Sequence, residues 1–374
     1  MPRPTSGAAS SDYTLYMIVL DSHCDSPSQM YRLRDFGKDN SWGQVDFPKM
    51  KKGGIDASFF ALFTSNSMEP KAAHDYALAM LAEVERQVAA NSSVVAFARS
   101  AADIRTNKDK GLMSILIGME NGSPIMGSLD ELRAFWDRGV RYMTLTHNGD
   151  NDICDSCGGQ HKWGGLSPFG REVVAEMNRL GMIIDIAHCS DDTVRDCLSV
   201  SKAPIVTTHS CCKALAGHRR NLSDELMRGL ADKGGVMQIN FYPVFLSNSF
   251  AETLEASHLE DKMWVEDEFI ADPSNADKVA AWVELQNQLN SLPRPSCVEI
   301  ADHVDHAVKV CGVEHVGLGS DYDGIEVTPA GMEDISKYGL VFDELHRRGY
   351  SDDAIEKIAG GNFLRVMDEI QNLK

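Results

Sequence analysis

The sequence predicts an α/β protein folded as a (β/α)8 TIM barrel, and three observations support this. Eight short apolar runs are spread along the chain, most of them rich in β-branched residues, as is typical of strands buried on both faces. Helical patterns with recognisable ends separate these runs. Polar side chains follow most of the runs directly, where a barrel carries its chemistry. A doubly wound open sheet is the alternative architecture.

The predicted strands are the eight apolar runs themselves. They are Leu15–Leu20, Ile55–Phe63, Leu112–Met119, Val140–Thr146, Met182–Ala187, Pro204–Thr208, Gly235–Phe241 and His315–Gly319. Each is short enough for a strand and too short for a helix of ordinary length.

The helices between the strands are predicted from their ends. Four serines precede acidic residues and are expected to cap helix N-termini, namely Ser128, Ser190, Ser223 and Ser351. Ser128 and Glu131 have the spacing of a capping box. Gly139, Gly181 and Gly349 follow helical patterns and are expected at helix C-termini.

The chain is predicted to contain one large domain. Residues 1–12 are small and polar, and we expect them to form a disordered tail. Residues 13–374 are predicted to form a single catalytic barrel. Residues 243–297 interrupt the strand–helix alternation and have a helical pattern of their own, which includes Lys278–Leu289. An insertion after the seventh predicted strand is expected to form a lid or wall over the active face.

Charge and cysteine content restrict the partners and the location. A formal net charge of −19 argues against nucleic acid or an anionic membrane surface as a partner. No apolar stretch approaches the roughly 18 residues of a membrane span, so no membrane anchor is predicted. Nine cysteines, an odd number, indicate a reducing compartment, and a cytoplasmic location is expected. The lone pair Cys154 and Cys157 is only a weak signal for metal or redox chemistry.

The first predicted strand leads into a cluster of polar residues. Asp21, His23 and Asp25 alternate along the chain, which predicts that they share one side of the strand. An imidazole with one or two carboxylates is a typical set of ligands for zinc or a similar divalent ion. The alternative is a histidine hydrogen-bonded to aspartates in a turn before Pro27.

Other predicted strands end in the same way. The polar residues at or just past their ends are Glu120, His147, His188, His209 and Asp321. Each has an ordinary explanation when taken alone, such as capping a backbone carbonyl or a helix. Their joint occurrence at the C-terminal ends of barrel strands instead predicts one catalytic site.

Counting donors gives a binuclear metal site. His23, Asp25, His188 and His209 supply three imidazoles and a carboxylate, and Glu120 can offer one oxygen to each of two ions. Two zinc-like ions bridged by Glu120 and a water or hydroxide would lower the pKa of that water. The same ligands bind manganese or cobalt with lower affinity.

Three further residues are expected to serve catalysis or substrate binding. His147 is a candidate for stabilising an oxyanion. Asp321 is a candidate for moving the proton of the water to a leaving amine. Arg220 is suited to binding a substrate carboxylate, whereas its neighbour Arg219 is expected to be a solvated surface cation.

The full motif set resembles the membrane (renal) dipeptidase family of zinc metallopeptidases, peptidase family M19. It comprises Asp21-Ser22-His23-Cys24-Asp25, Gly118-Met119-Glu120, Leu145-Thr146-His147, Asp185-Ile186-Ala187-His188, Thr208-His209-Ser210, Arg219-Arg220-Asn221 and Gly319-Ser320-Asp321-Tyr322-Asp323-Gly324. The match runs in order from about Leu20 to Val366. It implies a TIM barrel of the metal-dependent hydrolase type and a zinc-dependent dipeptidase that cleaves dipeptides with a metal-bridging hydroxide.

The resemblance also implies residue roles. His23 and Asp25 would hold one zinc, His188 and His209 the other, and Glu120 would bridge them. His147 and Arg220 would contact the substrate, and Asp321 rather than Asp323 would be the acid/base. Members of the family are often homodimers, and some open β-lactam rings. The chain is similar to soluble bacterial-type members rather than to lipid-anchored mammalian ones.

Two other functions are compatible with a barrel of this kind. The first is another amidohydrolase-type barrel acting on a non-peptide amide or a β-lactam. Such enzymes usually open with His-x-His and often use a carbamylated lysine on strand four, whereas this chain has His23-Cys24-Asp25 and no lysine there. The second is a non-catalytic binding protein, which would be expected to have lost ligands, and none is missing.

Overall fold

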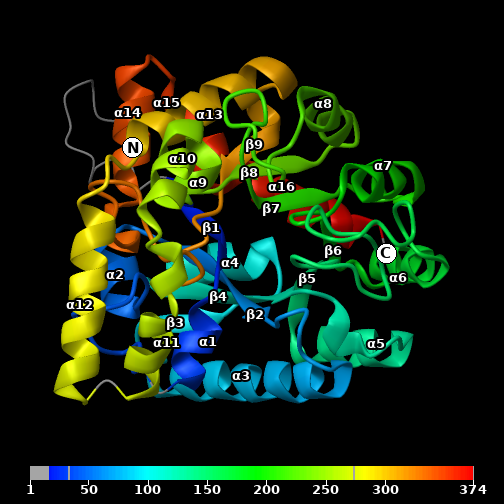
Figure 1. Cartoon of the computed structure of the whole chain (residues 1–374). Coiled ribbons are helices and arrows are strands. Elements are labelled where there is room, and N and C mark those ends of the chain that lie inside the picture. Colours follow the sequence, from blue (N-terminus) through cyan, green and yellow to red (C-terminus); the bar gives the residue numbers. More distant parts are fainter. Residues whose placement is uncertain (1–16, 33, 273, 374) are drawn as a thin grey trace.

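The computed structural model describes residues 17–32, 34–272 and 274–373, and its parallel strands form a barrel surrounded by helices (Figure 1). Hydrogen bonding connects eight strands in the order β1-β2-β4-β5-β6-β7-β8-β9. Their bounds are Leu20–Cys24, Ala57–Phe63, Met113–Glu120, Val140–Thr144, Ile183–Asp185, Val206–Ser210, Val236–Ile239 and Val316–Leu318. All seven pairings along this path are parallel, as the predicted barrel requires.

The first and last strands meet just beyond the end of β9. The backbone N–H of Asp25 donates to the carbonyl of Tyr322 at 2.9 Å, and the N–H of Asp321 donates to the carbonyl of His23 at 3.0 Å. Asp21 accepts hydrogen bonds from the backbone N–H and the hydroxyl of Ser320 at 2.8 and 2.6 Å. These contacts nearly close the barrel and place the ends of β1 and β9 beside each other.

Two strand predictions need correction. The first predicted strand, Leu15–Leu20, overlaps β1 only at Leu20; residues 15 and 16 lie outside the described residues. Pairing with β2 begins at Leu20 because Val19 instead donates its N–H to the Asp56 side chain at 2.9 Å. The second correction is a missed strand, β3 (Val95–Phe97), which pairs only with β4 and lies off the barrel path. The predicted tail, residues 1–12, lies outside the described residues.

The helices follow the strands as the alternation predicts. Their bounds are α1 Ser26–Tyr31, α2 Phe47–Lys52, α3 Pro70–Ala90, α4 Ala101–Asp109, α5 Leu129–Arg138, α6 Pro168–Leu180, α7 Asp191–Val200, α8 Asp224–Asp232, α9 Pro243–Leu246, α10 Asn248–Ser257, α11 Trp264–Ala271, α12 Ala276–Asn290, α13 Cys297–Cys311, α14 Gly339–Arg347, α15 Asp352–Glu356 and α16 Asn362–Asn372. Short helical turns occupy Ser123–Ile125, Glu260–Lys262, Val313–His315, Ile335–Lys337 and Lys357–Gly361.

The four predicted serine caps are confirmed, but the capping box of Ser128 and Glu131 is not completed, because the Ser128 N–H donates to the carbonyl of Ile125. The side chains of all four capping serines accept a backbone N–H from the first turn of α5, α7, α8 and α15. Gly139 and Gly181 end α5 and α6 with φ values of 109° and 75°, which a residue with a Cβ adopts only at a cost. Because β5 and β6 start almost at once after these glycines, the turns fix where both strands enter the barrel.

Apolar side chains fill the barrel interior at the N-terminal ends of the strands. Leu20, Phe59, Leu116 and Val206 belong to one buried cluster with Phe363 of α16. Burial of such side chains stabilises the fold by about 2 kcal/mol each. With this end packed, the hollow part of the barrel is at the C-terminal ends of the strands.

Residues 243–297 contain α9, α10, α11 and α12, which lie together on one side of the barrel (Figure 1). The predicted helix Lys278–Leu289 falls within α12. Within the described part of the chain, no helix is long and apolar enough to cross a membrane. All nine cysteines have free thiols, and Cys154 of the lone CxxC pair is buried.

Candidate active site

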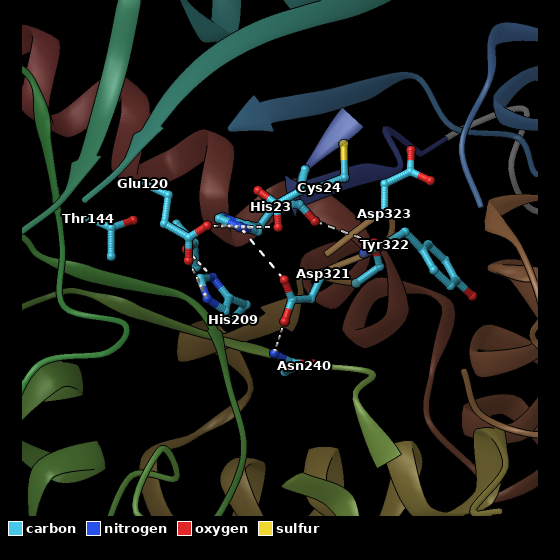
Figure 2. Close-up of polar contacts among 12 residues, drawn as sticks. His23, Cys24, Glu120, Thr144, His209, Asn240, Asp321, Tyr322 and Asp323 are labelled. Carbon is cyan, nitrogen blue, oxygen red and sulfur yellow. Dashed lines mark hydrogen bonds and ion pairs between the residues drawn. The ribbon is translucent and has the colours of Figure 1, made fainter. Parts of the chain in front are cut away.

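The C-terminal ends of the strands converge on His23, which is fully buried at the end of β1. Its Nε2 atom lies 3.4 Å from Glu120 Oε2, 3.8 Å from Asp25 Oδ2 and 3.8 Å from Asp321 Oδ1. Figure 2 shows Glu120 and Asp321 turned toward this imidazole from opposite sides. Three buried carboxylates around one nitrogen make this a position that favours a positive charge.

The second half of the cluster is formed by His188 and His209. Their Nε2 atoms are 3.0 Å apart and lie 2.9 and 3.5 Å from Glu120 Oε1. Glu120 therefore directs one oxygen at this histidine pair and the other at His23. A carboxylate in this arrangement can offer one oxygen to each of two ions.

The two halves have opposite electrostatics. Burial lowers the pKa of His188 and His209 well below the usual value, which keeps both imidazoles neutral. Burial also opposes a charge on His23, but the carboxylates of Glu120 and Asp25 outweigh it and raise the pKa of His23. Neutral imidazoles are metal ligands, and the charge that the carboxylates favour near His23 can be supplied by a cation.

The remaining nitrogen of each histidine has a hydrogen-bonding partner. The Nδ1 atoms of His23, His188 and His209 lie 2.7, 3.0 and 2.9 Å from Tyr142 Oη, Asn148 Oδ1 and Thr208 Oγ1. The Thr208 hydroxyl donates to Asp185 at 2.7 Å, so it can accept from the N–H of His209. These contacts orient the Nε2 atoms toward Glu120.

The sequence reasoning assigned no orienting role to these residues. Tyr142 lies inside a strand and was indistinguishable there from an ordinary core residue. Thr208, Asp185 and Asn148 lie within three positions of predicted site histidines, and this proximity was the available signal. Strand alternation was also wrong for Asp21, which hydrogen-bonds Ser320 and does not join the cluster. The pairing of β1 with β2 shifts register between Asp21 and Cys24, so regular alternation fails across His23.

His147 lies in the loop after β5 and lines the cavity above the cluster. Its ring centroid is 4.2 Å from that of His188 and 4.8 Å from that of Phe63. Burial lowers the pKa of His147, so its neutral form is favoured. A neutral imidazole can donate one N–H to an oxygen that gains negative charge.

Arg219 and Arg220 differ in burial. Both line the cavity, but Arg219 is exposed, whereas Arg220 is 5% exposed. The guanidinium of Arg220 donates to the carbonyl of His209 at 3.0 Å and lies 5.3 Å from the ring centre of Phe245. A guanidinium held in this way is prepared to bind a carboxylate.

Asp321 and Asp323 occupy different environments although both follow β9. Asp321 Oδ2 accepts from Asn240 Nδ2 at 2.8 Å, and its Oδ1 faces His23. Burial raises the pKa of Asp321 to about 6. The carboxylate of Asp323 points away from the cluster (Figure 2) and pairs with Arg34. Asp321 is therefore the one placed to exchange protons with groups at the cluster.

The backbone is strained at two of these positions. His188 and Asp321 have φ values of 64° and 63°, in the left-handed region that non-glycine residues rarely occupy. Such conformations cost about 1 kcal/mol or more and persist where the surroundings impose them. Here they turn two functional side chains into the barrel mouth.

A cavity of about 880 Å³ lies over the cluster. The strand-end residues form its floor, and Met263, Glu266 and Ile270 of the insertion form part of its wall. The insertion therefore forms part of the cavity wall.

The residues fit a pair of divalent ions. His23 Nε2 and Asp25 Oδ1 are buried and have no hydrogen-bond partner among the described residues. Three overlapping groups of donors lie close enough to share an ion: His23, His209 and Asp321; Glu120, His188 and His209; and His23, Asp25 and Glu120. Nitrogen and oxygen donors in these numbers suit zinc or a similar ion.

Comparisons with known proteins agree with this geometry. The sequence model of the membrane dipeptidase family, peptidase family M19, matches residues 11–374. Dipeptidase aclJ of Aspergillus oryzae is 32% identical over 92% of this chain and 74% of its own length. Two uncharacterized dipeptidases of Schizosaccharomyces pombe are 30% and 32% identical over 95% and 93% of this chain and 81% and 79% of their own lengths.

Solved structures share the fold. The probable dipeptidase PvdM of Pseudomonas aeruginosa has a TM-score of 0.83 at 27% identity and covers 98% of both chains. A metallopeptidase of Rhodobacter sphaeroides, solved with a phosphinate mimic of the dipeptide L-Ala-D-Ala, has a TM-score of 0.78 at 23% identity over 94% of this chain and 99% of its own. The match of the family model over nearly the whole chain shows that this protein belongs to the membrane dipeptidase family, peptidase family M19.

Proposed function

We propose that this member of the family is a metal-dependent dipeptidase that uses two zinc ions bridged by Glu120. The observation that carries the proposal is the position of Glu120, with one oxygen toward His188 and His209 and the other toward His23 and, beyond it, Asp25. Ions bound to these groups would lower the pKa of a water molecule and polarise the scissile carbonyl.

Arg220 binds the terminal carboxylate of the substrate. Because its guanidinium is bonded to the backbone of His209, a carboxylate held there lies close to the cluster. The scissile carbonyl must then be in the last peptide bond of the substrate. A carboxylate clamp at this short range favours dipeptides over longer peptides whose cleavage site lies further from the C-terminus.

His147 and Asp321 act on the bond that breaks. The neutral imidazole of His147 donates an N–H to the carbonyl oxygen as negative charge develops on it. Asp321 accepts a proton at Oδ1 and delivers it to the departing amine nitrogen. Asn240 holds the other oxygen of Asp321, so the carboxylate does not rotate away from the cluster.

Metal analysis combined with a substrate panel tests the proposal. We expect elemental analysis to find close to two zinc ions per chain, and purified protein to cleave dipeptides but not tripeptides. Chelation should abolish the cleavage, and added zinc should restore it. If the protein bound two metals and cleaved a non-peptide amide or a β-lactam but no dipeptide, the substrate class proposed here would be wrong. If it bound no metal, a non-catalytic binding protein would be the better interpretation.

A further inference from the structure

Arg34 lies outside the catalytic cluster and is nevertheless tied to the segment that carries Asp321. Its guanidinium pairs with the carboxylate of Asp323, two residues after Asp321. The Arg34 side chain is 1% exposed and that of Asp323 is 2% exposed. A fully buried ion pair needs further polar partners, and both residues have them.

The carboxylate of Asp323 has several hydrogen-bond donors around it. Besides Arg34, it accepts from Ser26 Oγ at 2.8 Å and from the backbone N–H of Gln44 at 2.9 Å. The Gln44 side chain in turn accepts the N–H of Asp323 at 2.7 Å and donates to the carbonyl of Ile325 at 2.7 Å. The segment after β9 is thereby fixed on both sides of Asp323.

This anchoring matters because the same segment has an unfavourable backbone conformation. Asp321 and Asp323 have φ values of 63° and 64°. Gly324 packs so closely on Asp25 that an added Cβ would lie 1.9 Å from its Oδ2 atom. A small relaxation at Asp323 would therefore move Asp321 relative to Asp25 and His23.

Arg34 itself is held by aromatic rings. Its guanidinium carbon lies 4.5 Å from the ring centre of Phe36 and 5.2 Å from that of Trp42, and it also donates to the carbonyl of Val45 at 2.7 Å. Trp42 packs edge-on against Phe269 of α11 at 5.1 Å. The same anchor thus contacts the insertion helix that lines the cavity.

From these contacts we propose that Arg34 is a positioning residue that holds Asp321 in its catalytic orientation through Asp323. The assignment rests on the proposed function, because it concerns the step that Asp321 performs. In the described part of the chain, the contacts of Arg34 include none of the residues proposed to hold the metals or to bind the substrate. Its removal should therefore affect turnover more than substrate binding or metal content.

Chemical rescue of an Arg34→Ala variant tests the assignment. We expect kcat to fall about 10- to 100-fold, as for a catalytic group displaced by about 1 Å, while KM changes less than about threefold. Zinc content should stay at the wild-type value. Guanidinium chloride at millimolar, non-denaturing concentration should restore much of the lost kcat, because the ion can fill the space between Asp323 and the two rings.

Arg294→Ala is the matched control. Arg294 is another buried arginine, 7% exposed in its side chain, and it pairs with Glu333 at 3.5 Å and the carbonyl of Thr328 at 3.0 Å. Its loss should lower the melting temperature without a selective fall in kcat or a response to guanidinium. A charge-retaining Arg34→Lys variant should remain impaired, because lysine lacks the planar group that stacks between the rings.

The outcomes separate this assignment from the proposed function. An active wild type with an Arg34→Ala variant of normal kcat would overturn the assignment alone. So would an impaired variant that guanidinium does not rescue, or one that has lost its zinc. A wild type that cleaves no dipeptide would overturn the proposed function and this assignment with it. Rescue by guanidinium with full zinc content would support both.

Discussion

At the scale of single residues, the environment of Asp321 distinguishes it from the other carboxylates of the cavity. One oxygen is bonded to Asn240, and the other faces His23. We expect Asp321→Asn to reduce kcat by about 10²- to 10⁴-fold, because the amide cannot carry the proton. Steady-state kinetics on a dipeptide, with zinc analysis of the same sample, checks this.

Glu326 provides a control for Asp321. It lines the same cavity and lies five positions further along the segment. Glu326→Gln should retain most of the wild-type kcat. Near-normal turnover of Asp321→Asn would show that another group moves the proton.

Arg220 gives a second prediction at this scale. Arg220→Met should raise KM for dipeptides about 10- to 100-fold, because a charge-assisted bond to the terminal carboxylate contributes about 1.5–3 kcal/mol. The matched variant Arg228→Met should change KM little, since Arg228 is an exposed residue of α8 and is not among the residues that line the cavity. With a dipeptide amide, which lacks the carboxylate, wild type and Arg220→Met should have similar KM values. A large difference with the amide would contradict the carboxylate role.

At the scale of secondary-structure elements, α5 and α6 are joined by Glu176. Its carboxylate accepts from Arg179 at 2.6 and 2.8 Å and from Arg133 at 2.5 Å. The hydrogen bonds from Arg179 and then Arg133 outweigh burial and lower the pKa of Glu176 to about 2. Because the pKa is lower in the folded state, these contacts stabilise the fold above pH 4.5 and lose their effect as the pH falls toward 2.

Glu176→Gln is therefore expected to reduce the free energy of unfolding by about 1 kcal/mol at pH 6, a value discounted because both arginines are largely exposed. The difference from wild type should shrink as the pH falls from 4.5 toward 2. Denaturant titrations at pH 6 and pH 3 measure it. Glu172→Gln on the exposed side of α6 should show no such change. A difference that is independent of pH would show that the contacts are not electrostatic.

The elements also show what the sequence could predict. Seven apolar runs marked their strands within a few residues because both faces of those strands are buried. β3 was missed because only three residues pair, on one side, and they include the exposed Phe97. The polar residues after the strands indicated the site, but they did not indicate the residues that orient its histidines. Tyr142 acts through a hydroxyl whose partner, His23, is brought near only by the closed barrel.

At the scale of the whole molecule, the cluster brings three carboxylates into a small buried volume around His23. Bound cations relieve this repulsion and stabilise the native state by mass action. We expect chelation to lower the melting temperature by several degrees and zinc to restore it. Scanning calorimetry checks this, and an unchanged melting temperature after complete metal removal would contradict it.

The homodimer stays a prediction, and light scattering would show whether the protein forms one.

The contacts between β1 and the segment after β9 also determine when the protein becomes functional during its synthesis. Asp21 and Ser320 are 299 residues apart in the chain, and the carbonyl of His23 is bonded to Asp321 across the same junction. Ser320 must emerge from the ribosome before these partners can meet. Contacts of such long range form late and slowly. A nascent chain therefore carries His23, Asp25 and Glu120 well before the contacts that bring Asp321 beside them can form.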